Sequence, residues 1–433
     1  MSPVADTSYY RATATPYPEY ASLQGRAHAR VAIVGGGYAG LNTALGLAER
    51  GFDDVVLLEQ DQVGFGASGR NGGFVFAGYS LGEQALLDQQ DGTRARALFK
   101  LTTEAVQRIR QRVHEYDIAC DVVDEGVVWA NWFRDPAILH QRQQLLADHF
   151  GVQWQWLTQA ELGERVHSER YHDALYERDA LHLHPLNYTI GLASAASRQG
   201  VRMHENSGVR HLSRQGAQWC LRTDQGELLA DQVVLACGGY LAGLHRAIDR
   251  SVLPIATYVM VTEPLGGRLA QCLQTRAAVY DSRFAFDYYR PLPDTRLLWG
   301  GRISIRSRSP QAVRRLLKND LLRVFPQLGD VQIDYAWSGL MSYARHQMPQ
   351  IGGDSSGKEH GLWWAQAFGG HGLAPTCAAG ELLAAAIAEG DDGWRQFADY
   401  GLHNVHRPAG YLAAQASYWW QQARDGIKTR LEG

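Results

Sequence analysis

The stretch Val31-Ala-Ile-Val-Gly-Gly-Gly-Tyr-Ala-Gly40 decides the fold of this chain. Its first four residues are apolar and mostly β-branched, which is typical of a buried parallel strand. The glycines lead into residues 41–50, a sequence that favours a helix, and a second apolar run at residues 55–58 ends in Glu59. A strand, a glycine-rich turn, a helix and a second strand together predict a βαβ unit of the kind that binds dinucleotides.

Each glycine of the turn meets a different requirement of a bound pyrophosphate. Gly35 allows the tight turn, Gly37 lets the backbone approach the phosphates, and Gly40 lets the helix pack closely against the strand. Tyr38 and Ala39 open that helix, whose N-terminus attracts negative charge. These five residues are therefore candidates for cofactor binding.

Glu59 stands nineteen residues after Gly40, at the end of the second predicted strand. Its carboxylate can accept hydrogen bonds from the ribose hydroxyls of an adenosine, and Gln60 follows it as a further candidate. An acidic side chain at this position disfavours a 2′-phosphate, so NADP is not expected. The spacing alone leaves both NAD and FAD open.

A second glycine-rich stretch, Gly64-Phe-Gly-Ala-Ser-Gly-Arg-Asn-Gly-Gly73, favours FAD. It is too rich in glycine for the interior of a helix or strand, and such a loop presents backbone amides to a polar ligand. Its polar side chains add hydrogen-bond donors for phosphate, ribityl or flavin oxygens. The candidate cofactor-binding residues of this loop are Ala67, Ser68, Arg70, Asn71, Gly72 and Gly73.

The composition is that of a folded globular protein. The 433 residues are 45% hydrophobic and 20% charged, and the net charge of −3 gives no reason to expect a nucleic acid or an anionic membrane as partner. Five widely spaced cysteines form no CxxC pair and the histidines lack zinc-ligand spacing, so we expect neither a disulfide framework nor a metal site. The absence of a signal peptide and of a long apolar run predicts a cytoplasmic protein.

The order of the predicted elements indicates an α/β fold with a discontinuous Rossmann-like FAD-binding domain. A strand-rich block over residues 252–305 predicts an inserted, mainly antiparallel β-sheet domain for the substrate. We predict five segments, namely 1–92 as the first part of the FAD-binding domain, 93–160 as a substrate or cap segment, 161–248 as the second part of the FAD-binding domain, 249–338 as the substrate-domain sheet, and 339–433 as the third part with a C-terminal helix.

Four motifs occur in the order in which one known family has them. They are Gly66-Ala-Ser-Gly-Arg-Asn-Gly-Gly73, Val233-Val-Leu-Ala-Cys-Gly-Gly239, Met348-Pro-Gln-Ile-Gly352 and Phe368-Gly-Gly-His-Gly372. Through these motifs the chain resembles the D-amino-acid-oxidase-like superfamily of FAD-dependent oxidoreductases over nearly its whole length. It is most similar to the branch that contains γ-glutamylputrescine oxidase and bacterial L-pipecolate oxidase.

The resemblance implies further cofactor contacts. The residues concerned are Val209, Ala236 and Gly238 toward the adenosine and pyrophosphate, and Gly370, His371, Gly372 and Leu373 toward the pyrimidine edge of the flavin. A helix N-terminus with N–H groups at that edge would stabilise the negative charge of reduced flavin. His371 is therefore also a candidate catalytic residue, and a loop histidine bound to solvent or backbone is the alternative.

The same superfamily includes a sarcosine-oxidase branch, and this chain departs from the sequence pattern of that branch at two positions that bear on the chemistry. No cysteine occurs near residues 341–343, where that branch attaches its flavin, so we expect non-covalent FAD. Ala374 replaces the lysine that pairs with the substrate carboxylate in that branch, and Arg302 lies near the position of its oxygen-activating lysine. Arg302 can bind a carboxylate with two prongs or form a structural salt bridge, and both interpretations stay open. The electron acceptor is then oxygen or a membrane quinone.

The resemblance implies oxidation of a C–N bond in a small amine or amino acid to the imine, by hydride transfer to flavin N5. We favour a cyclic secondary amino acid such as L-pipecolate as the substrate. The alternative is γ-glutamylputrescine or another ω-amine, and the alternative from a different class is an NAD-dependent dehydrogenase. Tyr258 and Tyr343 are the candidate pocket tyrosines, and they complete the catalytic set with Arg302 and His371.

Other aromatic residues are interpreted mainly as core. Strand alternation puts Phe284, Phe286 and Tyr288 on one face of the middle block and Tyr289 on the other. Residues 418–420, Tyr-Trp-Trp, can face a membrane as a peripheral contact or meet a second subunit. Packing against the cofactor domain is the favoured interpretation for them.

Overall fold

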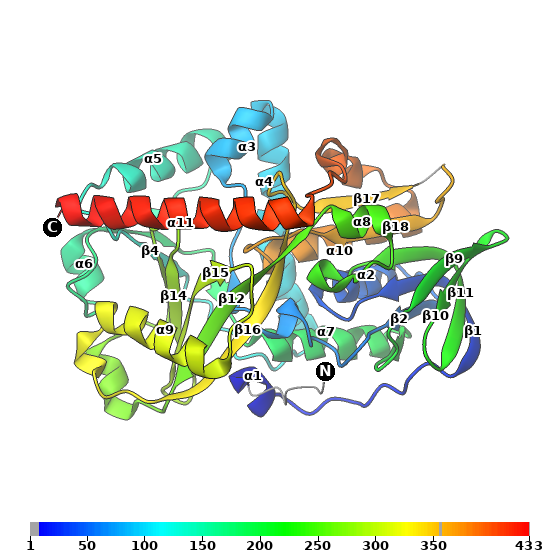
Figure 1. Cartoon of the computed structure of the whole chain (residues 1–433), viewed down its shortest axis with the longest axis horizontal. Helices are drawn as coiled ribbons and strands as arrows, with labels where there is room; N and C mark the ends of the chain where they lie inside the picture. The colour runs from blue at the N-terminus through cyan, green and yellow to red at the C-terminus, as the bar shows by residue number, and fades with distance from the viewer. Residues whose placement is uncertain (1–7, 355–356, 433) are drawn as a thin grey trace.

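The computed structural model describes residues 8–354 and 357–432, so the outermost ends of the first and last predicted segments lie outside the described part. Two eight-stranded sheets lie beside each other, with helices packed around them (Figure 1). One sheet contains the N-terminal βαβ unit, and the other contains the strand-rich middle of the chain. The predicted α/β fold with an added, mainly antiparallel sheet is confirmed.

The first sheet carries the dinucleotide-binding unit. Its strand order is β17-β18-β11-β1-β2-β8, and the hairpin of β9 and β10 extends it beside β11. The strands are β1 (Gly25–Val34), β2 (Val55–Leu58), β8 (Arg202–His204), β9 (His211–Gln215), β10 (Gln218–Arg222), β11 (Gly226–Leu235), β17 (Gln350–Asp354) and β18 (Leu362–Gln366). Residues 31–34 and 55–58 are buried throughout, because both faces of a parallel sheet are covered.

Four helices pack into the largest hydrophobic core, which lies against this sheet. They are α2 (Tyr38–Glu49), α4 (Gly92–Glu115), α7 (Pro185–Arg198) and α10 (Leu373–Glu389). Helix α10 packs closely on both α2 and α4, and small residues make that approach possible. A side chain at Gly380, for example, would meet the backbone of Asn42.

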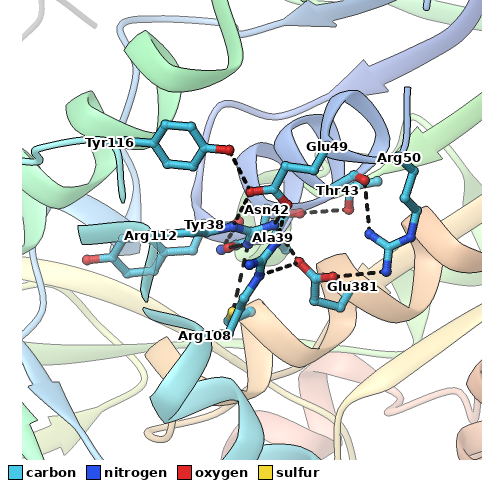
Figure 2. Close-up of polar contacts among 12 residues, drawn as sticks. Tyr38, Ala39, Asn42, Thr43, Glu49, Arg50, Arg108, Arg112, Tyr116 and Glu381 are labelled. Carbon is cyan, nitrogen blue, oxygen red and sulfur yellow. Dashed lines mark hydrogen bonds and ion pairs between the residues drawn. The ribbon is translucent and has the colours of Figure 1, made fainter. Parts of the chain in front are cut away.

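A buried ion cluster fastens three of these helices together (Figure 2). Arg112 of α4 is fully buried, and its guanidinium binds Glu49 of α2 at 2.5 Å and also Glu381 of α10. It donates a further hydrogen bond to the side chain of Asn42 at 2.7 Å, while Arg108 adds a second cation to Glu49. Because a buried charge without a partner is costly, the cluster fixes α2, α4 and α10 relative to one another.

The second sheet has the strand order β16-β12-β15-β14-β13-β4-β6-β5. Its strands are β4 (Val127–Ala130), β5 (Gln155–Leu157), β6 (Ala174–Glu177), β12 (Leu253–Thr262), β13 (Ala278–Asp281), β14 (Asp287–Pro291), β15 (Leu297–Ser304) and β16 (Ile333–Tyr343). Strands β13 and β4 pair in parallel, and the other neighbours pair antiparallel. Helix α9 (Pro310–Val324) packs into the hydrophobic core of this sheet through Val313, Leu317 and Leu321.

Short elements complete the described chain. They are α1 (Tyr9–Ala12), α3 (Glu83–Gln89), α5 (Ala137–Leu145), α6 (Gln159–Gly163), α8 (Arg246–Arg250), and the strand pair β3 (Phe74–Val75) and β7 (Leu181–His182). Within residues 8–354 and 357–432, no helix is both long enough and apolar enough to cross a membrane.

Helix α11 (Arg407–Glu432) lies across the second sheet and ends far from the first one (Figure 1). The hydroxyl of Tyr418 accepts a hydrogen bond from the backbone of Ile303 in β15, at 3.3 Å. Trp419 and Trp420 point away and are 63% and 71% exposed. The favoured interpretation of residues 418–420, packing against the cofactor domain, is therefore wrong.

Two predicted segment assignments also need correction. Strand β6 was placed in the FAD-binding part 161–248, but it pairs with β4 and β5 in the second sheet. Helix α4 was placed in the cap segment 93–160, but it packs in the core of the first sheet. Strand β16 continues across the predicted boundary between residues 338 and 339. Strand pairing and helix docking depend on distant partners, which local sequence patterns do not identify.

Candidate cofactor and substrate site

One large cavity lies where the two sheets meet. Its volume is about 1450 Å³, whereas a pocket for one small ligand typically measures roughly 300–1,000 Å³. Its walls include the turn between β1 and α2, the end of β2, the N-terminus of α10, parts of β12 to β16, and the inner side of α11. The cavity therefore has room for a dinucleotide together with a substrate.

The glycine turn between β1 and α2 exposes its backbone to this cavity. Gly35 has a φ of +115°, and a Cβ there would lie 2.6 Å from the carbonyl oxygen of Ala236. A Cβ on Gly37 would lie 2.9 Å from Ser68 Oγ. Gly40 does not line the cavity, since its missing Cβ would meet the carbonyl oxygen of Gly35. Gly40 instead permits the close packing of β1 and α2. The part of the turn that lines the cavity is residues 35–39.

Glu59 closes this end of the cavity beside the turn. Its carboxylate accepts hydrogen bonds from the backbone N–H of Gly36 at 2.6 Å and of Asp61 at 3.0 Å. Burial raises the pKa of this carboxyl above its ordinary value. Gln60 lines the cavity next to it, and a Cβ on Gly208 would lie 3.0 Å from the Gln60 side chain. The segment that contains Val209 thus approaches the end of β2.

The second glycine-rich loop folds over the helix N-terminus. Ser68 Oγ accepts a hydrogen bond from the backbone N–H of Tyr38 at 2.9 Å, and Arg70 Nε donates to the carbonyl of Phe65 at 2.7 Å. The Asn71 side chain accepts from the backbone N–H of Gly73 at 2.8 Å. The loop residues that line the cavity are Phe65, Gly66, Ala67, Ser68, Arg70, Asn71 and Gly72.

Gly73, which the sequence predicts to bind the cofactor, does not contribute to the cavity wall, and neither do Gly64 and Gly69 of the same loop. Gly73 has a φ of +81°. A Cβ at this position would meet the carbonyl oxygen of Leu183, next to β7. Its glycine is therefore required by the close approach of two backbone segments.

The start of α10 forms the opposite end of the cavity. Gly370, His371, Gly372 and Leu373 line it, as does Ser80. Ser80 Oγ accepts hydrogen bonds from the backbone N–H of Gly370 at 2.9 Å and of His371 at 3.3 Å. Ser80 thus occupies these two N–H groups, and the N-terminus of α10 favours negative charge beside them.

His371 is held as a neutral imidazole. Its ring packs edge-on against Phe76, with 4.7 Å between the ring centroids. Burial is the main cause that lowers the pKa of His371 to about 4; the Glu83 carboxylate raises that pKa and Arg142 lowers it further. The ring is therefore uncharged at neutral pH.

The lining of the cavity fits FAD. Two helix N-termini, those of α2 and α10, open onto the same cavity, and each offers backbone N–H groups to an anionic group. Val209, Ala236 and Gly238 complete the wall around the first glycine turn. Within the described ranges no cluster of three or more metal-ligating side chains occurs.

Comparison with known proteins identifies the family. The model of the DAO family, described as FAD dependent oxidoreductase, matches residues 30–386. The chain belongs to the DAO family of FAD-dependent oxidoreductases. It is 34% identical over 429 residues to gamma-glutamylputrescine oxidoreductase of Escherichia coli K12, covering 97% of this chain and 99% of that protein. It is 26% identical over 332 residues to glycine oxidase of Geobacillus kaustophilus, covering 74% and 83%.

Solved structures of the same fold agree with this family. Glycine oxidase from Bacillus cereus matches with a TM-score of 0.72 at 19% identity, over 87% of this chain and 98% of that one. L-proline dehydrogenase from P. horikoshii matches with the same TM-score at 18% identity, over 89% and 99%. As a DAO-family member the chain is an FAD-dependent oxidoreductase of amines or amino acids, so the NAD-dependent alternative is set aside. When bound, FAD supplies the two-electron acceptor for this chemistry.

Tyr343 lies beside the start of α10 in this cavity. It lines the cavity at the end of β16, and a Cβ on Gly370 would lie 3.1 Å from its hydroxyl. Burial raises the pKa of Tyr343 to about 12, while the Gly370 backbone and Ser80 lower it. The phenol is thus a neutral hydrogen-bonding group beside the start of α10.

Tyr258 is not a cavity residue, so that prediction is wrong. Its side chain is 1% exposed, lies in the core beneath α9, and donates to the carbonyl of Arg306 at 2.7 Å. Its neighbour Thr257 lines the cavity, because successive side chains of a strand point to opposite faces. The sequence predicts that Thr257 and Tyr258 point to opposite faces of β12, but it does not predict which of the two faces α9 covers.

Arg302 lines the cavity, and its guanidinium is already paired. Its Nε and Nη2 bind the buried carboxylate of Asp320 in α9 at 2.8 and 2.6 Å. Arg302 is the extra residue of a bulge in β15 opposite Thr257 and Tyr258, with a φ of +59°. Of the two interpretations left open, the structure shows the salt bridge.

Several cavity residues were missed or taken for core. The cavity wall includes Phe284, Phe286 and Tyr288, which were interpreted as core. Tyr289 points to the opposite face of β14 and is core. The predicted alternation of the two faces is therefore correct, but the interpretation of the first face is not. Tyr280 of β13 adds a further ring to this wall. Ser80 carried no motif, and its role follows only from its contact with the α10 turn. The contribution of α11 depends on long-range docking.

Proposed function

We propose that this enzyme oxidises the primary amine of an elongated ω-amine, of the γ-glutamylputrescine type, to the imine. The full-length likeness to gamma-glutamylputrescine oxidoreductase carries this proposal, since it spans both the cofactor half and the substrate half of the chain. The length of the cavity supports it, because the lining continues past Tyr343 to Ile305 and Tyr418 under α11. A small cyclic substrate would leave that extension unfilled.

The substrate end of the cavity suits a neutral amine. Among the described lining residues the acidic side chains are Glu59 and Asp61, and both belong to the nucleotide end. Tyr343 and His371 are uncharged at neutral pH, and the rings of Tyr280, Tyr288 and others form an apolar wall. Such surroundings lower the pKa of a bound amine, which must lose its proton before its α-carbon is oxidised.

The expectation of L-pipecolate as substrate rested on Arg302 as a receptor for an α-carboxylate. In the structure the Asp320 carboxylate accepts hydrogen bonds from both Nε and Nη2 of that guanidinium. A carboxylate on the carbon next to the reacting nitrogen, as in L-pipecolate, would therefore have to displace a buried ion pair to reach Arg302, which is costly. We accordingly rank the ω-amine ahead of the cyclic amino acid.

We infer that FAD is held without a covalent bond. Met341, Ser342 and Tyr343 line the cavity at the position where the sarcosine-oxidase branch has its cysteine. Cys237 is the cysteine among the described lining residues; it lies beside the β1 turn, and burial raises the pKa of its thiol to about 12. Acid precipitation should therefore release all of the yellow cofactor into the supernatant.

We also infer that oxygen reoxidises the reduced enzyme slowly and that a quinone serves as acceptor. No lysine occurs among the described lining residues, and His371 is neutral. Of the lining arginines, Arg302 is paired with Asp320 and Arg210 with Asp224, Arg70 donates to the carbonyl of Phe65, and Arg345 is exposed. A positive charge beside the reaction centre would be needed to stabilise anionic oxygen species. Stopped-flow reoxidation by dissolved oxygen and by a water-soluble quinone should show a faster reaction with the quinone.

The substrate proposal is tested by anaerobic flavin reduction. The holoenzyme is mixed with γ-glutamylputrescine, putrescine, L-pipecolate, L-proline, sarcosine or glycine, and loss of the flavin absorbance is followed over time. We expect the first compound to reduce the flavin with the highest ratio of rate constant to dissociation constant. Faster reduction by L-pipecolate would contradict the proposal and restore the cyclic amino acid as the substrate.

A further inference from the structure

Helix α11 has one face that is bound to the protein. Tyr418 and Asp425 are buried, and the Asp425 carboxylate accepts a hydrogen bond from the backbone N–H of Phe284 at 2.8 Å. Thr429 Oγ1 accepts from the indole N–H of Trp132 at 3.1 Å. These contacts run along the helix, so its orientation on the second sheet is fixed.

The opposite face of α11 is apolar and exposed. Of the exposed large hydrophobic side chains in the described chain, most lie on this helix; they are Leu412 (70% exposed), Trp419 (63%), Trp420 (71%), Ile427 (58%) and Leu431 (83%). At about 100° per residue they fall within one sector of roughly 120°. Ala416 and Ala423, also exposed, lie between them. We call these seven side chains the outer stripe of α11.

Basic residues flank the outer stripe, while the acidic residues of the helix turn inward. Arg424 and Arg430 are exposed; Arg424 lies at one edge of the stripe, and Arg430 lies near the other edge, at the angle of Leu412. Asp425 is buried, and Glu432 accepts a hydrogen bond from the backbone N–H of Arg134 at 2.7 Å. The outward half of α11 is therefore apolar with a positive rim, although the whole chain carries a net charge of −3.

We propose that the outer stripe of α11 docks this enzyme on an anionic lipid surface. Tryptophan is favoured at the boundary between lipid tails and headgroups, and a helix lying in that boundary combines an apolar stripe with flanking cations. Arg424 and Arg430 are placed to meet negatively charged headgroups, whose attraction adds to the burial of the stripe. This proposal rests on α11 alone and is independent of the substrate.

A second copy of the chain fits the stripe less well. If two stripes packed together, Arg424 and Arg430 would find no acidic side chain of α11 on the facing surface. Charge complementarity thus selects the lipid surface over self-association.

Docking through α11 would place lipid next to the cavity. Ala414 and Tyr418 line the cavity from the inner side of the helix. The lipid surface and the cavity would then be separated by little more than one helix, about 10 Å across.

The test is vesicle binding by the FAD-loaded enzyme. Sedimentation with vesicles of phosphatidylcholine alone is compared with vesicles that also contain phosphatidylglycerol. We expect binding to the anionic vesicles, with a blue shift of tryptophan fluorescence, and weak binding to the neutral ones. The variant Arg424→Gln/Arg430→Gln should bind roughly thirtyfold more weakly, from the usual attraction of two basic residues to such a surface.

Matched variants separate the stripe from general charge and from misfolding. Trp419→Ser/Trp420→Ser should lose vesicle binding, whereas Arg96→Gln/Arg178→Gln, an equal loss of exposed charge elsewhere, should keep it. All three should retain their FAD absorbance and thermal midpoint, because none of these side chains is buried or lines the cavity.

Three outcomes would overturn the proposal. The first is no binding to anionic vesicles, and the second is equal binding by the wild type and the tryptophan variant. The third is a dimer in sedimentation analysis that Trp419→Ser/Trp420→Ser abolishes, which would assign the stripe to a second copy.

Discussion

The two ends of the cavity are built in different ways. The nucleotide end is shaped by backbone, with Gly35 and Gly37 left bare and Glu59 fixed by the N–H groups of Gly36 and Asp61. The substrate end is shaped by side chains from separate strands and from α11, among them Tyr288 and Tyr343. A binding surface made of backbone depends on a short local sequence pattern, and it suits a cofactor that is the same in every family member. A wall of side chains can change from one family member to the next, which suits a variable substrate.

The largest expected effect lies in the ion cluster that supports the nucleotide end. Arg112→Met would leave the partly buried carboxylates of Glu49 and Glu381 without their central, fully buried cation, and we expect a loss of about 3–5 kcal/mol in the free energy of unfolding. Urea unfolding of the holoenzyme measures it. Arg108→Met is the matched control, since its side chain is 28% exposed, and it should cost about 1 kcal/mol or less. Equal losses would mean that the cluster does not hold the three helices as described.

The next effect concerns the glycine turn itself. Gly40→Ala would force α2 away from the carbonyl of Gly35 and displace the helix N-terminus from the cavity. We expect FAD binding to weaken by roughly a hundredfold, or about 3 kcal/mol. Fluorescence titration of the apoprotein with FAD measures it. Gly163→Ala, where a Cβ meets nothing within 4 Å, should bind FAD like the wild type.

At the substrate end the comparison predicts opposite results for two tyrosines. Tyr343→Phe removes a neutral hydrogen-bonding group beside the start of α10, and flavin reduction should slow roughly tenfold, as for one lost hydrogen bond. Tyr258→Phe removes only the bond to the Arg306 carbonyl, so it should cost about 1 kcal/mol of stability and leave the reduction rate unchanged. A slow Tyr258→Phe enzyme would show that the cavity extends beneath α9.

The last expected effect is the pH dependence of stability due to His371. Because its pKa is about 4 in the folded protein and near its ordinary value of 6.5 when unfolded, the unfolded state binds more protons between these values. Stability should therefore fall as the pH drops from about 6.5 to about 4. His371→Gln should show a smaller fall over that window in urea unfolding at several pH values. An unchanged pH dependence would mean that His371 is not buried.

The difference between the backbone-shaped nucleotide end and the side-chain-shaped substrate end also explains how far the sequence could predict the structure. Gly35, Gly37, Gly40 and Glu59 work through local spacing, so their placement followed from a single βαβ pattern. Tyr258 was misplaced because alternation predicts two faces but not which one α9 covers.

Long-range contacts account for the remaining errors. The close approach of Gly73 to the backbone of Leu183 could not be predicted, because the two residues are distant in sequence. Trp419 and Trp420 were expected to pack on the cofactor domain, whereas the docking of α11 leaves them exposed. Each of these features depends on which distant segments meet.

The central claim is that one cavity holds FAD along its backbone-lined end and an amine at its side-chain-lined end. The most direct test is a crystal structure of the enzyme with FAD and an unreactive γ-glutamylputrescine analogue. We predict the FAD pyrophosphate beside Gly37, the flavin beside Gly370, and the amine nitrogen of the analogue next to Tyr343. An analogue bound outside this cavity, or FAD bound away from both helix N-termini, would contradict the claim.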